Sequence, residues 1–197
     1  DVTSSDPTVG AITTGPVTFL PNVGAVATQF DPLQAGVVTI TAETPAGFDQ
    51  SSTSRQITAT VTAPDISINS GFDVRVGEDL QTPIFISLQT APPTSVDVTV
   101  TIGSGSVATL TQTATVAGGT TVVFRDVTTT SVGTVFVQGR ALGATSITAS
   151  ASGYDPDTRA VTVDPSGFVI SRSSFATTTY SGNTNVPIVS GRLTPGT

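Results

Sequence analysis

The feature that most constrains this chain is an internal repeat of about a hundred residues. The stretch VTITAETPAGFDQSSTSRQITATVTAP (38–64) is echoed by SITASASGYDPDTRAVTVDP (146–165), and Arg159 follows Arg55 by 104 positions. Both copies keep one order: an alternating pattern, a Gly with an aromatic residue, a polar turn, an Arg and a second alternating pattern. This period is too long for a solenoid unit and suits an independently folding domain.

The echo extends to both sides of these stretches. PVTF (16–19) corresponds to TVVF (121–124), and VGAI (9–12) corresponds to VATL (107–110). A third, shorter copy follows near the end of the sequence. Its matches are FVI (168–170) to ISI (66–68), Phe175 to Phe72 at 103 positions, and PIVS (187–190) to PIFIS (83–87).

These offsets predict the domain organisation. Residues 65–164 form one complete repeat, 1–64 hold the C-terminal two-thirds of a preceding repeat, and 165–197 hold the N-terminal strands of a third. Each junction carries a Pro, which interrupts a strand ladder and stiffens a short linker. We therefore expect sandwiches arranged end to end, with junctions at Pro64, Asp65, Asp164 and Pro165.

Apolar residues recur at every second position, which is typical of strands with one buried face. Val96, Val98, Val100 and Ile102 show this alternation most clearly. Thr and Val favour a pleated backbone, while good helix formers are scarce. Gly, Pro and Asp punctuate the strands at the short spacing of a sandwich. The pattern predicts an all-β fold with almost no helix.

The composition excludes most reactive sites. The chain has no His and no Cys, and its seven basic residues are all Arg, so no residue of the usual kind activates a Ser nucleophile. A net charge of −7 argues against nucleic acid and anionic membranes as partners. No apolar run is long enough for a transmembrane helix. Asp1 and the absence of Met suggest a processed product or an excised fragment.

The segment TVFVQGRALGATSITASASGYDPDTRAVTV (134–163) resembles the end of a bacterial immunoglobulin-like (Big-type) domain. SVATL (106–110) is similar to the mid-domain strand of that family, and VGAI (9–12) is its weaker counterpart. The resemblance implies tandem immunoglobulin-like Greek-key β-sandwiches of seven strands. It also implies an extracellular location, in a cell-surface or secreted protein, and no common active site.

Four carboxylates near the predicted domain ends are candidate calcium ligands, because calcium can rigidify a junction through several oxygen atoms. They are Asp65, Asp155, Asp157 and Asp164. Their spacing matches no calcium-binding motif, and the first copy has only Asp49 in the corresponding turn. Turn formation is therefore the favoured interpretation, and we expect no catalytic residue, no cofactor and no metal.

Other polar and aromatic residues have structural interpretations that outweigh functional ones. Tyr154 and Phe48 are expected to plug the ends of their own cores, with ligand stacking as the alternative. Arg55 and Arg159 are expected to be edge charges paired with a nearby Asp, with a substrate clamp as the alternative. Glu78 precedes Asp79, and neighbours on a strand point to opposite faces, which makes a hydrolase dyad unfavourable.

The two terminal segments together amount to about one repeat, and neither can close a sandwich alone. We therefore expect partners that are copies of the same chain, arranged head-to-tail, or adjacent repeats of one polypeptide. The predicted function is a non-enzymatic structural repeat of an extracellular filament, stalk or sheath. An adhesin or carbohydrate-binding module, with a glycan or receptor as ligand, is the alternative, and an accessory domain of a secreted hydrolase is a third.

Overall fold

The structure is a computed structural model that describes residues 1–49, 51 and 53–194. The chain divides into two compact units, Asp1–Ala63 and Pro64–Thr197. The described residues contain one short 3-10 helix, η1 (Asn69–Gly71), and otherwise only strands and loops, so the all-β prediction is confirmed. None of the described residues form a helix with the length and hydrophobicity needed to cross a lipid bilayer. The last three residues of the predicted 165–197 segment lie outside the described residues.

Unit 1 contains two small antiparallel sheets with little core of their own. Val38 is the only hydrophobic side chain among its described residues that is fully buried. One sheet has the order β1-β4-β5, and the other pairs β2 with β3. The strands are β1 (Val2–Ser4), β2 (Gly10–Ile12), β3 (Phe30–Pro32), β4 (Gly36–Ala42) and β5 (Gln56–Val61).

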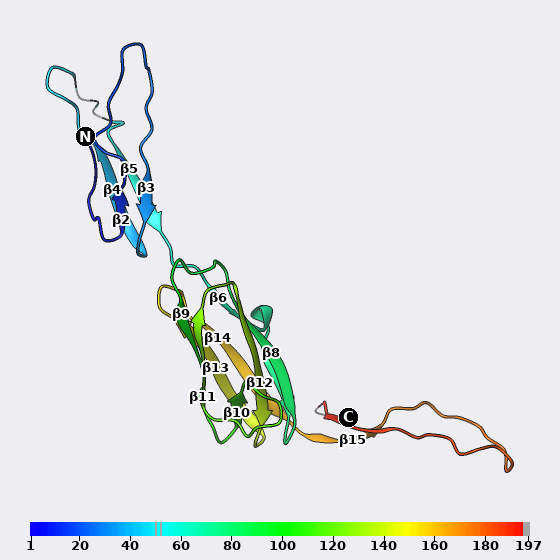
Figure 1. Cartoon of the computed structure of the whole chain (residues 1–197). Coiled ribbons are helices and arrows are strands. Elements are labelled where there is room, and N and C mark those ends of the chain that lie inside the picture. Colours follow the sequence, from blue (N-terminus) through cyan, green and yellow to red (C-terminus); the bar gives the residue numbers. More distant parts are fainter. Residues whose placement is uncertain (50, 52, 195–197) are drawn as a thin grey trace. The chain divides into compact units, whose positions relative to one another are not determined.

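Unit 2 begins with a sandwich of two sheets (Figure 1). The strand orders are β10-β12-β8-β6 in one sheet and β11-β9-β13-β14-β7 in the other. These nine strands, over the described residues, exceed the seven that the resemblance implied. They are β6 (Ile66–Ile68), β7 (Val74–Gly77), β8 (Gln81–Leu88), β9 (Val96–Ile102), β10 (Ala108–Thr111), β11 (Thr121–Val127), β12 (Ser131–Gly139), β13 (Gly143–Ala151) and β14 (Asp157–Asp164).

The core of the sandwich follows from the period-two pattern, because alternate side chains of a strand point to the same face. Val98 and Val100 of β9 are fully buried, and so are Ile147 and Ala149 of β13. Residues from both sheets form one continuous hydrophobic cluster. The alternation of apolar residues in the sequence therefore marks the inner faces of these two sheets.

The chain enters and leaves the sandwich at opposite ends (Figure 1). Asp155, just before β14, donates its N–H to the Pro64 carbonyl at 3.0 Å. The chain therefore enters at the end of the sandwich where β14 begins, which we call the proximal end. It leaves after Asp164, where β14 ends. The eight residues of β14 span about 25 Å at the usual rise of a strand. We call the end near Asp164 the distal end.

The edge strand β11 carries a bulge in its ladder with β9. The register with β9 shifts between Phe124 and Val127, and Asp126 has a positive φ of 53°. Asp97 holds the bulge, because its carboxylate accepts a hydrogen bond from the Asp126 N–H at 3.1 Å and pairs with Arg125 at 3.1 Å. A bulged and charged edge is a poor template for a further strand.

A hairpin follows the sandwich within unit 2. β15 (Ser166–Ile170) pairs antiparallel with β16 (Ile188–Arg192), and the 17 residues 171–187 connect them without regular structure. No other strand of the described chain pairs with either one.

Strand register shows that unit 1 reproduces part of the sandwich. Ile12 of β2 pairs with Phe30 of β3 as Leu110 of β10 pairs with Val137 of β12. In the same way, the pairing of β4 with β5 matches that of β13 with β14, and the pairing of β1 with β4 matches that of β9 with β13. Unit 1 therefore has counterparts of β9, β10, β12, β13 and β14. Its described residues contain none of β6, β7 or β8.

The predicted match between PVTF (16–19) and TVVF (121–124) is wrong at the level of secondary structure. Residues 121–124 begin β11, whereas 16–19 form no strand. Phe124 packs against the core, but Phe19 is exposed. The cause is the partner strand, since β11 pairs along most of β9 and the counterpart β1 has only three residues.

Candidate functional site

The proximal end of the sandwich is closed by main-chain contacts around Asp65 and Asp155. The Ile66 N–H donates to the Asp155 carbonyl at 3.2 Å. The Asp65 N–H donates to the Gln89 side-chain oxygen at 3.0 Å, and the Gln89 N–H donates back to the Asp65 carbonyl at 2.9 Å. These bonds tie the incoming chain to the sandwich. Asp65 and Asp155 serve here through their backbone groups.

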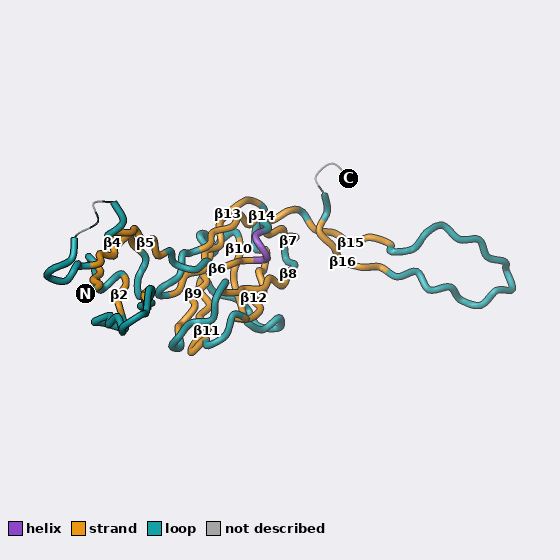
Figure 2. The backbone as a smooth tube through the Cα atoms, turned by 90° about the horizontal axis from the view of Figure 1, so that it is seen from above, coloured by secondary structure: helices purple, strands orange, loops and turns teal. Residues whose placement is uncertain are grey.

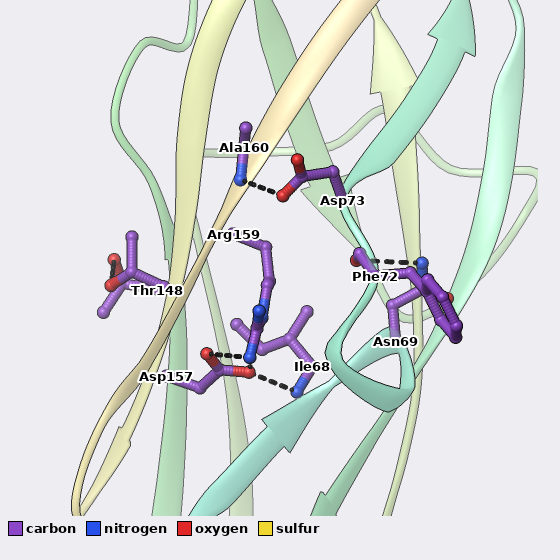
Figure 3. Close-up of polar contacts among 9 residues, drawn as sticks. Ile68, Asn69, Phe72, Asp73, Thr148, Asp157, Arg159 and Ala160 are labelled. Carbon is purple, nitrogen blue, oxygen red and sulfur yellow. Dashed lines mark hydrogen bonds and ion pairs between the residues drawn. The ribbon is translucent and has the colours of Figure 1, made fainter.

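Asp157 joins the end of β6 to the start of β14 (Figure 3). Its carboxylate accepts the Ile68 N–H at 2.9 Å and pairs with Arg159 at 2.9 Å. Nearby, the Asp73 carboxylate accepts the Ala160 N–H at 3.1 Å. The β7 ladder reaches β14 only from Val161 onward. Before Val161, η1 takes the place of a strand paired with β14. The carboxylates of Asp73 and Asp157 therefore supply the hydrogen bonds that join the start of β14 to the segment around η1.

The expected pairing of Arg159 with an Asp is confirmed. β14 lies between β13 and β7 within its sheet, but the ladder with β7 begins only at Val161. At Arg159, β14 therefore has a strand partner on one side only, which is β13.

Asp164 is the centre of a charged cluster at the distal end. Its side chain is 5% exposed and pairs with Arg75 of β7 at 3.2 Å and with Arg192 of β16 at 2.8 Å. Two guanidinium groups therefore neutralise one buried carboxylate, as such a charge requires. The cluster connects β14, β7 and the hairpin. The sequence alone does not reveal this cluster, because the three residues are far apart along the chain and share no motif.

The candidate calcium ligands do not converge on one site. Asp157 and Asp164 lie at the two ends of β14, and Arg side chains engage both carboxylates. Among the described residues, no group of three or more acidic, His or Cys side chains is arranged to hold a metal ion.

The base of the hairpin packs directly on the distal end. The Leu193 N–H donates to the Pro165 carbonyl at 2.7 Å, and the Ser166 hydroxyl donates to the Glu78 carbonyl at 2.6 Å. A Cβ atom on Gly77 would lie 3.0 Å from Ser166 Cβ, so glycine permits this approach. The hairpin thus has a fixed root at the predicted junction of Asp164 and Pro165.

The hairpin exposes an apolar face. Phe168, Ile170 and Ile188 point to the same side, because Ile170 and Ile188 are cross-strand partners and Phe168 lies two residues before Ile170. Their exposed fractions are 81%, 63% and 66%. We call these three residues the donor face.

Unit 1 has an apolar face that is only partly covered. Ile12, Phe30, Ile40 and Val61 are only half-buried. Their counterparts in the sandwich by strand register are fully buried, in one cluster that also contains residues of β6, β7 and β8; they are Leu110, Val137, Ile147 and Val163. We call the unit 1 set the acceptor face.

The aromatic residues of the two copies behave differently. Tyr154 packs against the core and donates its hydroxyl to the Thr90 carbonyl at 2.7 Å, and burial raises its pKa. This confirms the expectation of an end plug. Phe48 is exposed, so the same expectation is wrong for unit 1, which has no closed core end to plug.

Two remaining polar features have structural roles. The Gln138 side chain donates to the Val116 carbonyl at 2.8 Å and accepts the Gly118 N–H at 2.8 Å, which holds the 112–118 loop over a surface hollow. Glu78 and Asp79 lie in a turn after β7, where Asp79 has a φ of 58°, and not within a strand as expected.

No protein-family model and no curated protein matches this sequence. Among solved structures, the chain is similar to a crystal structure of domains 4 and 5 of the S-layer protein SbsC. The sequence identity is 19% and the TM-score is 0.35, over 82% of this chain and 74% of that chain.

Proposed function

We propose that the chain is a non-enzymatic structural repeat of a linear extracellular assembly, in which the hairpin of one copy completes unit 1 of the next. The sequence resemblance to bacterial immunoglobulin-like domains supports the extracellular location. The donor and acceptor faces support the assembly.

One observation supports this proposal above all others: the hairpin repeats the β6–β8 pair in register. Phe168 pairs with Ser190 as Ile66 pairs with Leu88, and Ile170 pairs with Ile188 as Ile68 pairs with Ile86. Every residue of the hairpin in these pairs lies 102 positions after its counterpart. β6 and β8 are among the sandwich strands that have no counterpart in the described residues of unit 1.

The burial of the two pairs supports the same conclusion. Ile66, Ile68 and Ile86 are at most 4% exposed, because β6 and β8 cover the other sheet of the sandwich. The three residues of the donor face occupy the equivalent positions of the hairpin, and no second sheet of the described chain covers them. Burying three large apolar side chains stabilises a complex by roughly 1.5–3 kcal/mol each before association costs.

The path of the chain favours a partner that is a second copy. The chain enters the sandwich at the proximal end through Pro64, and the hairpin is rooted at the distal end. Donor and acceptor are different surfaces, so each copy can bind one neighbour through each of them. A heterologous contact of this kind generates an open linear array.

The alternative function, an adhesin or carbohydrate-binding module, has one supporting observation. Tyr180 in the hairpin loop is 99% exposed, and Arg172 stacks at 4.4 Å over Phe175 in the same loop. Ligand binding by this loop does not require the donor face, which separates the two functions experimentally.

The test compares two double-serine variants of the full chain, whose substitutions lie on opposite sides of the hairpin. Sedimentation velocity at increasing concentration measures how far each variant assembles. The wild type should form a ladder of dimers and longer species. The I170S/I188S pair should lose assembly, because it removes two donor-face side chains. The V169S/V189S pair is the matched control, since the counterparts of these residues in β6 and β8 are Ser67 and Ser87.

The control should assemble like the wild type. Equal loss of assembly in both serine pairs would show unspecific association and would contradict the proposal. A wild-type chain that stays monomeric at all concentrations would contradict it as well.

A further inference from the structure

The connecting segment 171–187 has no strand, although its counterpart in the sandwich has two. Between β6 and the paired end of β8, the sandwich forms η1, β7 and the first part of β8. In the hairpin, only the residues of β15 and β16 that pair with each other are strands (Figure 2). The difference needs a physical cause, since both segments connect equivalent strand pairs.

The cause is the absence of partner strands. β8 pairs with β6 only at Ile86–Leu88, whereas Gln81–Ser87 pair with β12. β7 forms its ladder with β14. The outer part of β8 and all of β7 therefore depend on strands that belong to the C-terminal part of the repeat. Residues 171–187 have no such strands beside them among the described residues.

Unit 1 offers the two strand edges that these residues need. β12 and β14 each have two neighbours in their sheets, but their counterparts β3 and β5 each have one among the described residues. β5 therefore has an unpaired edge where β14 holds β7, and β3 has one where β12 holds β8. Unpaired edges accept additional strands.

We propose that docking of the hairpin on a second copy turns the connecting segment into strands. Residues 175–180 pair in parallel with β5 of that copy, and residues 183–187 extend β16 along its β3. This inference rests on the proposed function and defines the partner surface as the edges of β3 and β5 together with the acceptor face.

The sequence of the segment is compatible with strand formation. Thr177, Thr178 and Thr179 are β-branched and favour extended backbone. Pro187 does not prevent the extension of β16, since Pro83 lies inside β8 opposite Phe136. Before docking, Thr178 and Ser181 form only a local exposed turn, with the Ser181 N–H donating to the Thr178 carbonyl at 3.0 Å.

The first experiment measures amide hydrogen exchange of the full chain, in dilute monomer and in assembled material. Residues 171–187 should exchange rapidly in the monomer and at least about tenfold more slowly in the assembly, because new ladder bonds protect their N–H groups. The N–H groups of β5 on the unpaired edge should slow in parallel.

The second experiment uses matched double-proline variants of the full chain. T177P/T178P removes two successive N–H groups at the centre of the predicted strand. Successive N–H groups of a strand point to opposite edges, so one of the two must belong to the ladder with β5. S173P/S174P is the control, in the part that corresponds to η1. The first variant should weaken self-association at least about tenfold and the control less than about threefold.

The outcomes separate this inference from the proposed function. Assembly that depends on the donor face, with unchanged exchange at 171–187, would overturn the inference and leave the proposed function standing. Equal effects of the two proline pairs would also overturn it. Absence of any assembly would overturn both.

Discussion

The β6–β8 pair and the β15–β16 hairpin have the same register and opposite environments. In the first, the apolar side chains are buried under a second sheet, and in the second they face solvent. The strand pair therefore forms without a core, but its outer part does not, because 171–187 lacks strands that its counterpart has. The comparison shows that local pairing sets the register, while neighbouring partner strands decide the length of the strands and the facing sheet decides their burial.

The largest expected effect on stability is at a position that the two strand pairs share, which is Ile86 in β8 and Ile188 in β16. Ile86→Ala should lower the unfolding free energy of the sandwich by about 2–5 kcal/mol, because Ile86 is fully buried and the cavity cannot collapse completely. Ile188→Ala should leave this free energy unchanged in dilute monomer. Urea denaturation of the full chain measures both. A similar loss in the two variants would mean that the hairpin contributes to the sandwich core.

A smaller loss of unfolding free energy is expected at the Asp164 cluster, where the hairpin meets the sandwich. Asp164→Asn keeps the shape of the side chain but leaves Arg75 and Arg192 without their counter-charge. We expect a loss of about 1–3 kcal/mol, moderated because both guanidinium groups are partly exposed. Faster amide exchange at Leu193, whose N–H bonds to the Pro165 carbonyl, should accompany it.

The control for the charged cluster is an exposed ion pair on the same sandwich. Arg125→Ala removes the contact with Asp97, in which the Arg side chain is 74% exposed, and should cost less than about 1 kcal/mol. An equal cost for the two variants would show that burial of Asp164 adds nothing to the junction.

The smallest effect is expected at the proximal end. Tyr154→Phe removes the hydrogen bond to the Thr90 carbonyl and should cost about 0.5–1.5 kcal/mol. Burial raises the pKa of Tyr154 above 10.0, so the fold favours the neutral phenol. The stability that this group supplies is present below pH 10.0 and is lost as the pH rises through the raised pKa.

Denaturation between pH 8 and pH 11 checks this expectation. The difference between wild type and Tyr154→Phe should shrink at the alkaline end. Tyr180→Phe, at a fully exposed position, is the control and should follow the wild type throughout. A constant difference between wild type and Tyr154→Phe would contradict the assigned burial effect.

The sequence predicted the features that depend on local pattern. Alternating apolar residues marked the inner faces of β9 and β13, and the echo of Ile66–Ile68 in 168–170 identified β15 as a copy of β6. It could not predict features that depend on partner strands. Residues 16–19 match β11 in sequence but remain a loop, because β1 is too short to pair with them.

The charged contacts were equally hard to predict. Asp157 and Asp164 were expected near the domain ends, but their arginine partners could not be assigned. Arg75 and Arg192 reach Asp164 only because β7 adds in parallel to β14 and β16 returns to the distal end. Both events are long-range and leave no trace in spacing along the chain.

The parallel pairing of β7 with β14 determines how this domain responds to a pulling force. A load applied through Pro64 and Pro165 acts first on β6, which is paired with β8. Once β6 yields, the load draws β7 toward one end and β14 toward the other, parallel to their length. All rungs of that ladder, from Val161 opposite Val74 to Asp164 opposite Gly77, are then sheared together. Rupture requires their simultaneous failure, whereas a hairpin pulled from its open end unzips one rung at a time.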